Sequence, residues 1–141
     1  MYYHYRSTRK RYRKLKAANK KLTCTFCENV PAEKILHKTK HNMIIANRIP
    51  YDLWEHHHVT EHLMVLPIRH LHTLAEFSDE ELLDHARILA EYEANGYNIY
   101  ARSVDSTVRS VSHQHTHLIK LSPKFARAGF YTRKPYLHIT F

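Results

Sequence analysis

The sequence is poor in glycine and contains no long apolar run. Only two glycines occur among its 141 residues, which excludes a glycine-rich loop that cradles phosphates with backbone amides. No window holds the roughly 18 consecutive apolar residues that a membrane-spanning helix requires, and the basic start is not followed by the apolar core of a signal peptide. We therefore expect a cytoplasmic protein that does not contact a membrane.

Cysteine is also scarce, since Cys24 and Cys27 are the only two. A pair separated by two residues makes a poor structural staple, so metal binding or redox chemistry is expected. The spacing is that of one half of a tetrahedral zinc site, in which two thiolates and two neutral imidazoles leave bound Zn²⁺ electrically neutral. A redox pair and two idle thiols are the alternatives. Pro31 and the polar residues after it give little sign of the helix that a redox pair normally opens.

Acidic residues are missing from the first 22 positions, which carry nine Lys or Arg. These nine account for the formal net charge of +9, because the remaining 13 basic and 13 acidic residues cancel. Tyrosines are interleaved with the charges, and a mildly helical run over 8–21 has no apolar stripe wide enough to bury. We interpret 1–22 as a basic arm, mobile or lying on the surface, ahead of a single domain over 23–141.

The remaining pattern mixes strands with one main helix. Residues 43–46 and 63–66 are short apolar runs typical of buried strands, joined by a histidine-rich connection over 51–60. Ser78 starts a capping-box sequence before apolar residues at helical spacing, and Gly96 closes that helix. Strands are expected over 97–102 and 111–121, separated by a polar loop, with Pro123 ending the second. Residues 136–141 are expected as a further strand or an extended tail.

The most informative stretch sets three histidines, His113, His115 and His117, at alternate positions ahead of an apolar pair. On a strand they share one face. Neighbouring imidazoles then stand about 6–7 Å apart, a spacing suited to successive groups of one polyanion. In a chain with 14 histidines, the alternative is a solvated strand face. Three in register favour phosphate chemistry instead.

These motifs resemble the histidine triad (HIT) superfamily of nucleotide hydrolases and transferases, whose mark is His-φ-His-φ-His-φ-φ with φ apolar. The order of motifs agrees over about residues 23–121: the cysteine pair, the segment 61–70, the capped helix and the triad. Residues 47–51 also resemble a segment of the branch that acts on dinucleoside polyphosphates. Two departures stand inside the triad, where Gln114 and Thr116 occupy the φ positions. The reverse face of the strand must therefore be wet, paired or covered by polar groups.

The resemblance implies an α+β fold, with an antiparallel sheet packed against the main amphipathic helix, and a homodimer. It implies that His115 attacks the α-phosphate of a nucleotide conjugate and forms a covalent nucleotidyl-histidine intermediate. The candidate conjugates are dinucleoside polyphosphates and nucleoside phosphoramidates. His117 and Ser110 are the candidates for holding the non-bridging oxygens, in a catalytic group that also includes His113.

Four further residues are expected to contact the substrate or lie beside it. By resemblance, Asn47 faces the nucleotide sugar and His62 lies near the active site. Arg102 stands where the family usually has an Asn or Gln that reaches the phosphate. Arg102 and Arg109 would add fixed positive charge if they point inward, and a solvated surface position is an equally good interpretation.

In zinc-containing members of the family the cysteine pair is joined by the histidine that closes a Pro-x-x-His segment and by the first triad histidine. Here these are His70 and His113, so Cys24, Cys27, His70 and His113 would hold a structural Zn²⁺. Metal and nucleophile would lie one strand repeat apart, so zinc would not supply the attacking group. Residues 56–58 are expected to form an exposed loop.

These features are also consistent with a binding module rather than an enzyme. A zinc-stabilised module that binds nucleotides or RNA ends with little turnover would use residues 1–22 for recruitment. Nine positive charges interleaved with tyrosines favour phosphate backbones and offer stacking faces. Such arms also serve merely as solubilising segments.

Overall fold

The structure is a computed structural model that describes residues 2–126, 129–133 and 136–140. Its helices and strands, in chain order, are β1 (Tyr2–Tyr3), α1 (Arg6–Ala18), the 3₁₀ turn η1 (Asn19–Lys21), α2 (Thr25–Glu28), η2 (Ala32–Lys34), β2 (Ile35–Lys38), β3 (Asn42–Ala46), β4 (Leu53–Trp54), β5 (His57–Pro67), η3 (Leu74–Glu76), α3 (Asp79–Ala94), β6 (Tyr97–Ala101), β7 (Thr116–Phe125), β8 (Gly129–Arg133) and β9 (Tyr136–Thr140). In the part of the chain that is described, no helix is both long and apolar enough to cross a membrane.

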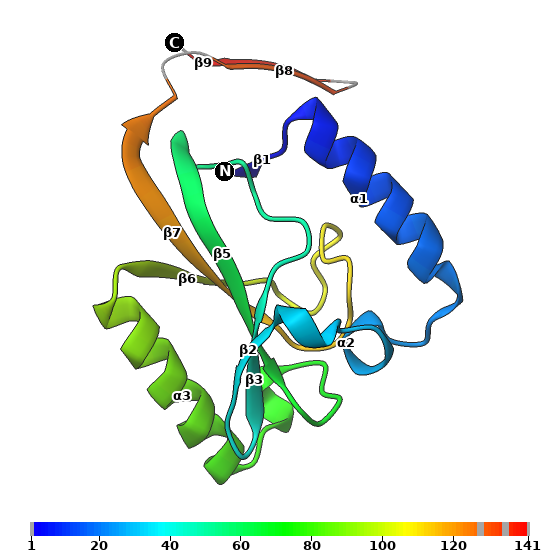
Figure 1. Ribbon diagram of the computed structural model, residues 1–141, viewed down its shortest axis with the longest axis vertical. Helices are drawn as coiled ribbons and strands as arrows, with labels where there is room; N and C mark the ends of the chain where they lie inside the picture. The colour runs from blue at the N-terminus through cyan, green and yellow to red at the C-terminus, as the bar shows by residue number, and fades with distance from the viewer. Residues whose placement is uncertain (1, 127–128, 134–135, 141) are drawn as a thin grey trace.

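One antiparallel sheet of seven strands organises the molecule (Figure 1). The path β1-β4-β5-β3-β2 is joined by β7, which pairs with β5 and β6. At the centre Met64 lies opposite His117 and Val65 opposite Thr116. Strands β8 and β9 form a separate hairpin. The predicted α+β class with an antiparallel sheet is confirmed.

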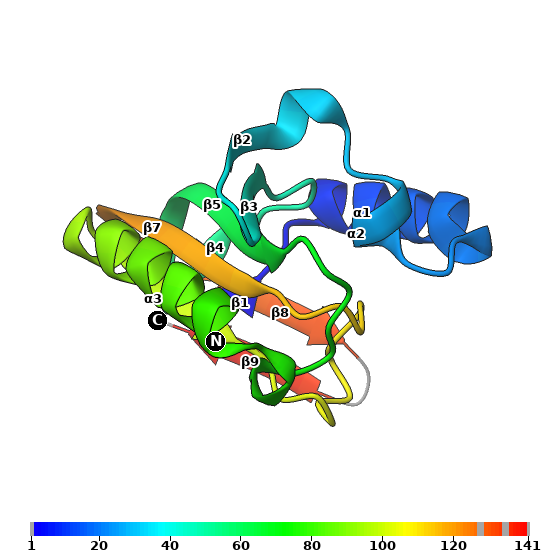
Figure 2. The same ribbon diagram turned by 90° about the horizontal axis from the view of Figure 1, so that it is seen from below.

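The two faces of the sheet are packed differently, because alternate side chains of a strand point to opposite faces. One face packs Ile44, Val65 and Leu118 against Ile88 of α3. The other face packs Ile45 and Met64 against residues of the α2 region, including Phe26. Helices α3 and α1 lie on opposite sides of the β5–β7 pair (Figures 1 and 2).

The capping box predicted at the start of α3 is confirmed. The Glu81 backbone N–H donates to the Ser78 hydroxyl at 3.3 Å, and the Ser78 backbone N–H donates to the Glu81 carboxylate at 2.8 Å. Arg69 adds an ion pair to the same carboxylate at 2.8 Å. The helix ends before Gly96, whose φ of +83° is a left-handed value that favours glycine.

Strand β7 differs from the predicted strand at both ends. It begins at Thr116, so that His113 and His115 precede it, and it continues through Pro123 to Phe125. The partner β6 ends its pairing at Lys120, so beyond that point β7 pairs only with β5. A proline is tolerated there because one edge of the strand makes no ladder hydrogen bonds.

The expectation of an exposed loop over 56–58 is wrong. Glu55 and His56 form a tight turn with φ values of 49° and 66°, and β5 already begins at His57. All three histidines of this run are half-buried, and His57 Nδ1 lies 3.1 Å from the Ser122 carbonyl oxygen. The final predicted strand corresponds to β9, while residue 141 lies outside the described residues.

Candidate functional site

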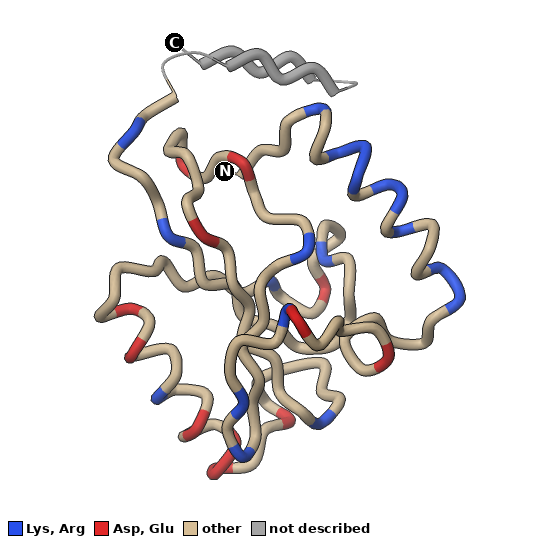
Figure 3. The backbone as a smooth tube through the Cα atoms, viewed as in Figure 1, with Lys and Arg blue, Asp and Glu red and all other residues tan. Residues whose placement is uncertain are grey.

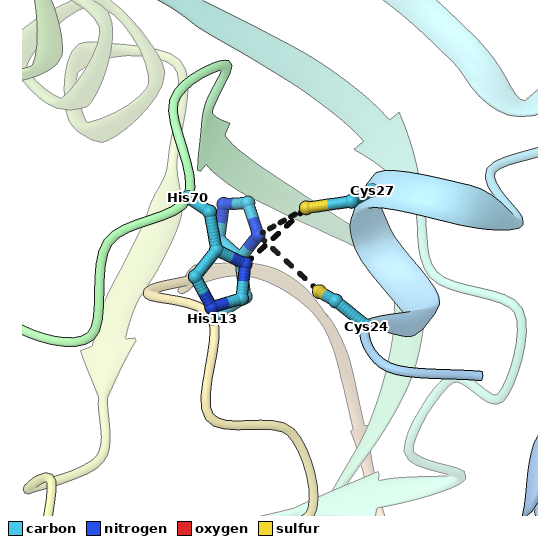
Figure 4. A group of neighbouring side chains, drawn as sticks. All are labelled: Cys24, Cys27, His70 and His113. Atoms are coloured by element: carbon cyan, nitrogen blue, oxygen red, sulfur yellow. Dashed lines mark hydrogen bonds between the residues drawn. The ribbon is translucent and has the colours of Figure 1, made fainter.

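The cysteine pair and two distant histidines come together beside the sheet (Figure 4). One ligand atom from each of Cys24, Cys27, His70 and His113 lies within 4.8 Å of the other three. Cys27 Sγ is 3.2 Å from His70 Nδ1 and 3.4 Å from His113 Nδ1. Two sulfurs and two imidazole nitrogens at this separation are a Cys₂His₂ donor set.

The surroundings of His113 fit a metal ligand. Its Nε2 lies 3.0 Å from the Pro67 carbonyl oxygen, and a carbonyl can only accept, so Nε2 carries the proton. Nδ1 therefore presents its lone pair toward the two sulfurs. A ligating histidine is commonly held by this kind of bond from its second ring nitrogen. The donor set thus fits the zinc ion that the sequence predicts.

His115 has the opposite tautomer. Its Nδ1 donates to the His113 carbonyl oxygen at 2.7 Å, which leaves the lone pair on Nε2. Burial, together with the positive charge of Arg109, lowers the pKa of His115 to about 4. The ring is therefore uncharged at neutral pH, as a nucleophilic nitrogen must be.

His117 is held by His62 on β5. The Tyr51 backbone N–H donates to His62 Nδ1 at 3.1 Å, so the proton of neutral His62 is on Nε2, which is 2.9 Å from His117 Nδ1. His117 in turn carries its proton on Nε2. Burial lowers the pKa of His62 to about 3 and that of His117 well below its usual value. Both rings are uncharged, and because His117 Nδ1 accepts from His62, the Nε2–H of His117 is its hydrogen-bond donor.

A cavity of about 960 Å³ contains both His115 and His117 in its wall, whereas His113 is not one of the residues that line it. Asn47 and Ser110, two of the predicted site residues, line the same cavity. Asn47 Oδ1 accepts from the Ile49 backbone N–H at 2.9 Å, and its Nδ2 lies 3.1 Å from His62 Nε2, which is a contact between two donors because that nitrogen carries the proton.

The two predicted arginines also line this cavity, in different ways. The Arg102 guanidinium lies 5.0 Å from the Tyr2 ring centre and donates to the Tyr51 hydroxyl at 3.3 Å. Arg109 Nη2 donates at 2.7 Å to the carbonyl oxygens of His72 and Ser112. Arg109 therefore ties the loop before the triad to the loop after β5, in addition to its place in the wall.

The two polar residues inside the triad are paired rather than wet. Gln114 Oε1 accepts from Arg109 at 3.3 Å. Thr116 Oγ1 lies 3.1 Å from Nε2 of His85 on α3, and His85 Nδ1 lies 3.0 Å from Asn42 Oδ1. The sequence predicts that the reverse face of the strand needs polar partners. It did not identify His85 as such a partner, because the helical spacing around His85 gives no sign of what its side chain contacts.

Residues of the basic arm were also missed as parts of the cavity wall. Tyr2, His4, Tyr12 and several lysines and arginines of 1–22 line the same cavity as His115. Tyr2 stacks on Tyr51 with ring centres 4.2 Å apart. The alternation of charge and tyrosine was visible in the sequence, but nothing local to that segment indicated what it would pack against.

Comparison with known proteins identifies the fold. No protein-family model matches the sequence. No curated protein sequence matches it. The structure is similar to a HIT family hydrolase from Legionella pneumophila, with 22% identity and a TM-score of 0.52 over 72% of this chain and 94% of that one.

Two further structures agree. A histidine triad protein from Clostridium difficile gives 18% identity and a TM-score of 0.52, covering 74% of this chain and 95% of that one. The diadenosine triphosphate hydrolase of Plasmodium falciparum gives 16% identity and a TM-score of 0.55, covering 70% and 67%. The chain has the fold of the histidine triad proteins.

Proposed function

We propose that the protein is a nucleotide hydrolase or nucleotidyl transferase of the HIT type, in which His115 attacks the α-phosphate of a nucleotide conjugate. The observation that carries the proposal is the tautomer of His115, an uncharged ring whose Nδ1 is bound to the His113 carbonyl oxygen. Its Nε2 lone pair is the nucleophile, in a cavity that His117 and Ser110 also line. Dinucleoside polyphosphates and nucleoside phosphoramidates are the substrate classes.

The reaction has two displacements. Nε2 of His115 forms a bond to the α-phosphorus while the bond to the leaving group breaks, and water then cleaves the phosphorus–nitrogen bond and restores the neutral ring. Phosphoryl-type transfer needs mainly positioning and charge stabilisation. His117 Nε2–H and the Ser110 hydroxyl hold the non-bridging oxygens, Arg102 adds positive charge, and Asn47 faces the sugar.

Cys24, Cys27, His70 and His113 hold a structural Zn²⁺ in this proposal. The ion would join the α2 segment to the residues that precede β7 and fix the chain next to the nucleophile. The chain's own residues then do the chemistry. A homodimer and a cytoplasmic location complete the proposal, and sedimentation analysis with fractionation of cells tests these two points.

Rapid quench with a labelled nucleoside phosphoramidate tests the chemistry. The expected result is an acid-labile, base-stable adduct that peptide mapping places on His115 and that His115→Asn does not form. Turnover without any adduct, or an equal adduct on the variant, would show that the mechanism is wrong.

A second candidate is a nucleic-acid-binding module with little turnover, and the basic helix α1 favours it. Deleting 1–22 is a poor test because Tyr2 packs in the core cluster of Tyr51 and Trp54. Measurable turnover with a nucleotide conjugate at a rate above that of His115→Asn excludes this candidate.

A further inference from the structure

Helix α1 lines the cavity that holds His115 and His117. Tyr12, Arg13 and Lys16 of the helix line this cavity together with His115, and Lys20 follows in the turn after it. The resemblance to the HIT family begins only after this segment. Any binding function of α1 is therefore an addition to the shared site.

The charge of the cavity wall is of one sign. Seven of the residues that line it are Lys or Arg, and none is Asp or Glu: Arg13, Lys16, Lys20, Lys34, Arg48, Arg102 and Arg109. A volume of about 960 Å³ lies at the upper end of the range of about 300–1,000 Å³ for sites that bind small ligands. The wall therefore has more positive charge and more room than a single nucleotide uses.

Folding does not account for the charges that α1 and the turn after it add to this wall. Helix α1 contains no buried residue. Polar contacts near its start fix its position: Asp52 accepts from the Tyr5 backbone N–H at 2.8 Å and from the Thr8 hydroxyl at 3.1 Å. Arg11 Nη2 also donates to the Arg48 carbonyl oxygen at 3.1 Å. Arg13, Lys16 and Lys20 take part in none of these anchoring contacts.

The positive charge continues outside the cavity. Arg6, Lys10, Lys14 and Lys21 are exposed and do not line it. Figure 3 shows the Lys and Arg positions following the whole length of α1, without an acidic position among them. Two nucleosides joined by a few phosphates would fit inside the cavity and leave this outer row unused, whereas a longer phosphodiester chain would follow it.

We propose that α1 binds a single-stranded nucleic acid whose end is joined to the nucleotide that His115 attacks. Arg13, Lys16 and Lys20 contact the phosphates nearest the scissile bond, and Tyr12 offers a face on which a base stacks. This inference rests on the proposed function and names its leaving group.

The step balances without a further reactant. His115 Nε2 forms the bond to the nucleotide's phosphorus, and the bridging phosphorus–oxygen bond breaks, so the strand leaves with a terminal phosphate. Water then adds to the phosphorus as the nitrogen bond breaks. A nucleoside monophosphate, a proton and neutral His115 result.

The test compares two substrates and two sets of substitutions. The substrates are a nucleoside monophosphate joined through a pyrophosphate to the 5′ end of a ten-nucleotide strand, and a dinucleoside diphosphate of the same bond type. The variant combines Arg13→Gln, Lys16→Gln and Lys20→Gln. Its control combines Lys38→Gln, Arg87→Gln and Lys124→Gln, exposed residues that do not line the cavity, with the same loss of charge.

The expected result is a loss of kcat/KM on the strand substrate that exceeds the loss on the short substrate by about tenfold or more. The negative slope of log kcat/KM against log salt should also become shallower by about two to three for the α1 variant, because each lost phosphate contact removes about one unit of slope. The control should keep the wild-type slope.

Equal losses on both substrates, or equal effects of the α1 variant and the control, overturn the inference. If wild type turns over neither substrate, fluorescence anisotropy with the labelled strand conjugate decides about α1. Weaker binding by the α1 variant than by the control then supports the strand site, and equal binding overturns it. The proposed function is wrong if wild type does not turn over a nucleoside phosphoramidate either.

Discussion

The two faces of the sheet carry helices of opposite character. Helix α3 has a complete capping box, buries Ile88 and His85, and begins with three acidic residues. Helix α1 buries nothing and has no acidic residue in its first turn. Figure 3 shows the contrast as Asp and Glu positions along α3 and Lys and Arg positions along α1.

The contrast indicates that different physical requirements explain the sequences of the two helices. Stability explains much of the sequence of α3, since its cap, the core contacts of Ile88 and Leu89, and His85 all have partners in the fold. The sequence of α1 contributes little to burial, and our inference explains its charge by what enters the cavity. Substitutions on the α3 face should therefore change stability, and those on the cavity face should change activity.

The largest effect is expected at the nucleophile. His115→Asn should lower kcat by at least about 10³-fold, because the nucleophilic nitrogen is lost. Its thermal unfolding midpoint should stay close to that of wild type, because Asn is also uncharged and its side-chain amide can keep the hydrogen bond to the His113 carbonyl oxygen that His115 Nδ1 makes. Steady-state kinetics and thermal unfolding of the same preparation check both parts, and a variant with near wild-type kcat contradicts the assignment.

The Cys₂His₂ donor set lies on the cavity face, and under our proposal it should behave as part of the structure. Cys24→Ser together with Cys27→Ser should remove bound zinc and lower the free energy of unfolding by several kcal/mol, because a structural metal contributes its binding free energy to folding. Elemental analysis and denaturant unfolding measure these effects. Retention of one equivalent of zinc by the double variant would rule out this site.

On the opposite face, His85→Leu should destabilise the protein by about 1–3 kcal/mol at pH 7, because Asn42 and Thr116 lose a buried hydrogen-bond partner. Burial lowers the pKa of His85 to about 4, although the charge of neighbouring Asp84 acts in the raising direction. In the unfolded chain the ring has its ordinary value of about 6.5.

The sign of the pH dependence follows from this difference. As pH falls from 6.5 to about 4, the unfolded chain takes up a proton at His85 that the folded chain does not. Wild-type stability should therefore fall more steeply over this window than that of His85→Leu. Denaturant unfolding at several pH values tests this expectation, and parallel curves for the two proteins contradict it.

The smallest effect is expected at the cap of α3. Ser78→Ala should cost about 1 kcal/mol of unfolding free energy and leave kcat/KM unchanged, because Ser78 does not line the cavity. Thermal unfolding and kinetics check it. A loss of activity in the folded variant would contradict the expectation that substitutions on the α3 face change stability alone.

Local patterns predicted the elements whose cause is local. The capping box of Ser78 and Glu81, the apolar runs of β3 and β5, and the closing Gly96 depend on neighbours within a few residues. The start of β7 was missed because His113 and His115 make other contacts than a ladder, to the Pro67 carbonyl oxygen and within their own segment. The turn at Glu55 and His56 was missed because it lacks the glycine that usually signals a turn of this kind.

The site could be predicted as far as motifs define it. The two cysteines predicted half of a metal site, but His70 and His113 were placed beside them by resemblance alone, because they are 43 and 86 residues from Cys27 in the chain. The position of α1 depends on Asp52 and other distant contacts, which no local pattern encodes. The proposed roles of the triad residues remain predictions.

The stereochemical course at phosphorus tests the central claim most directly. A nucleotide conjugate made chiral at its α-phosphorus with sulfur and oxygen isotopes is hydrolysed in labelled water, and the configuration of the product is measured by phosphorus NMR. Two displacements through His115 predict retention of configuration. Inversion would show that water attacks the phosphorus directly, and it would contradict the account.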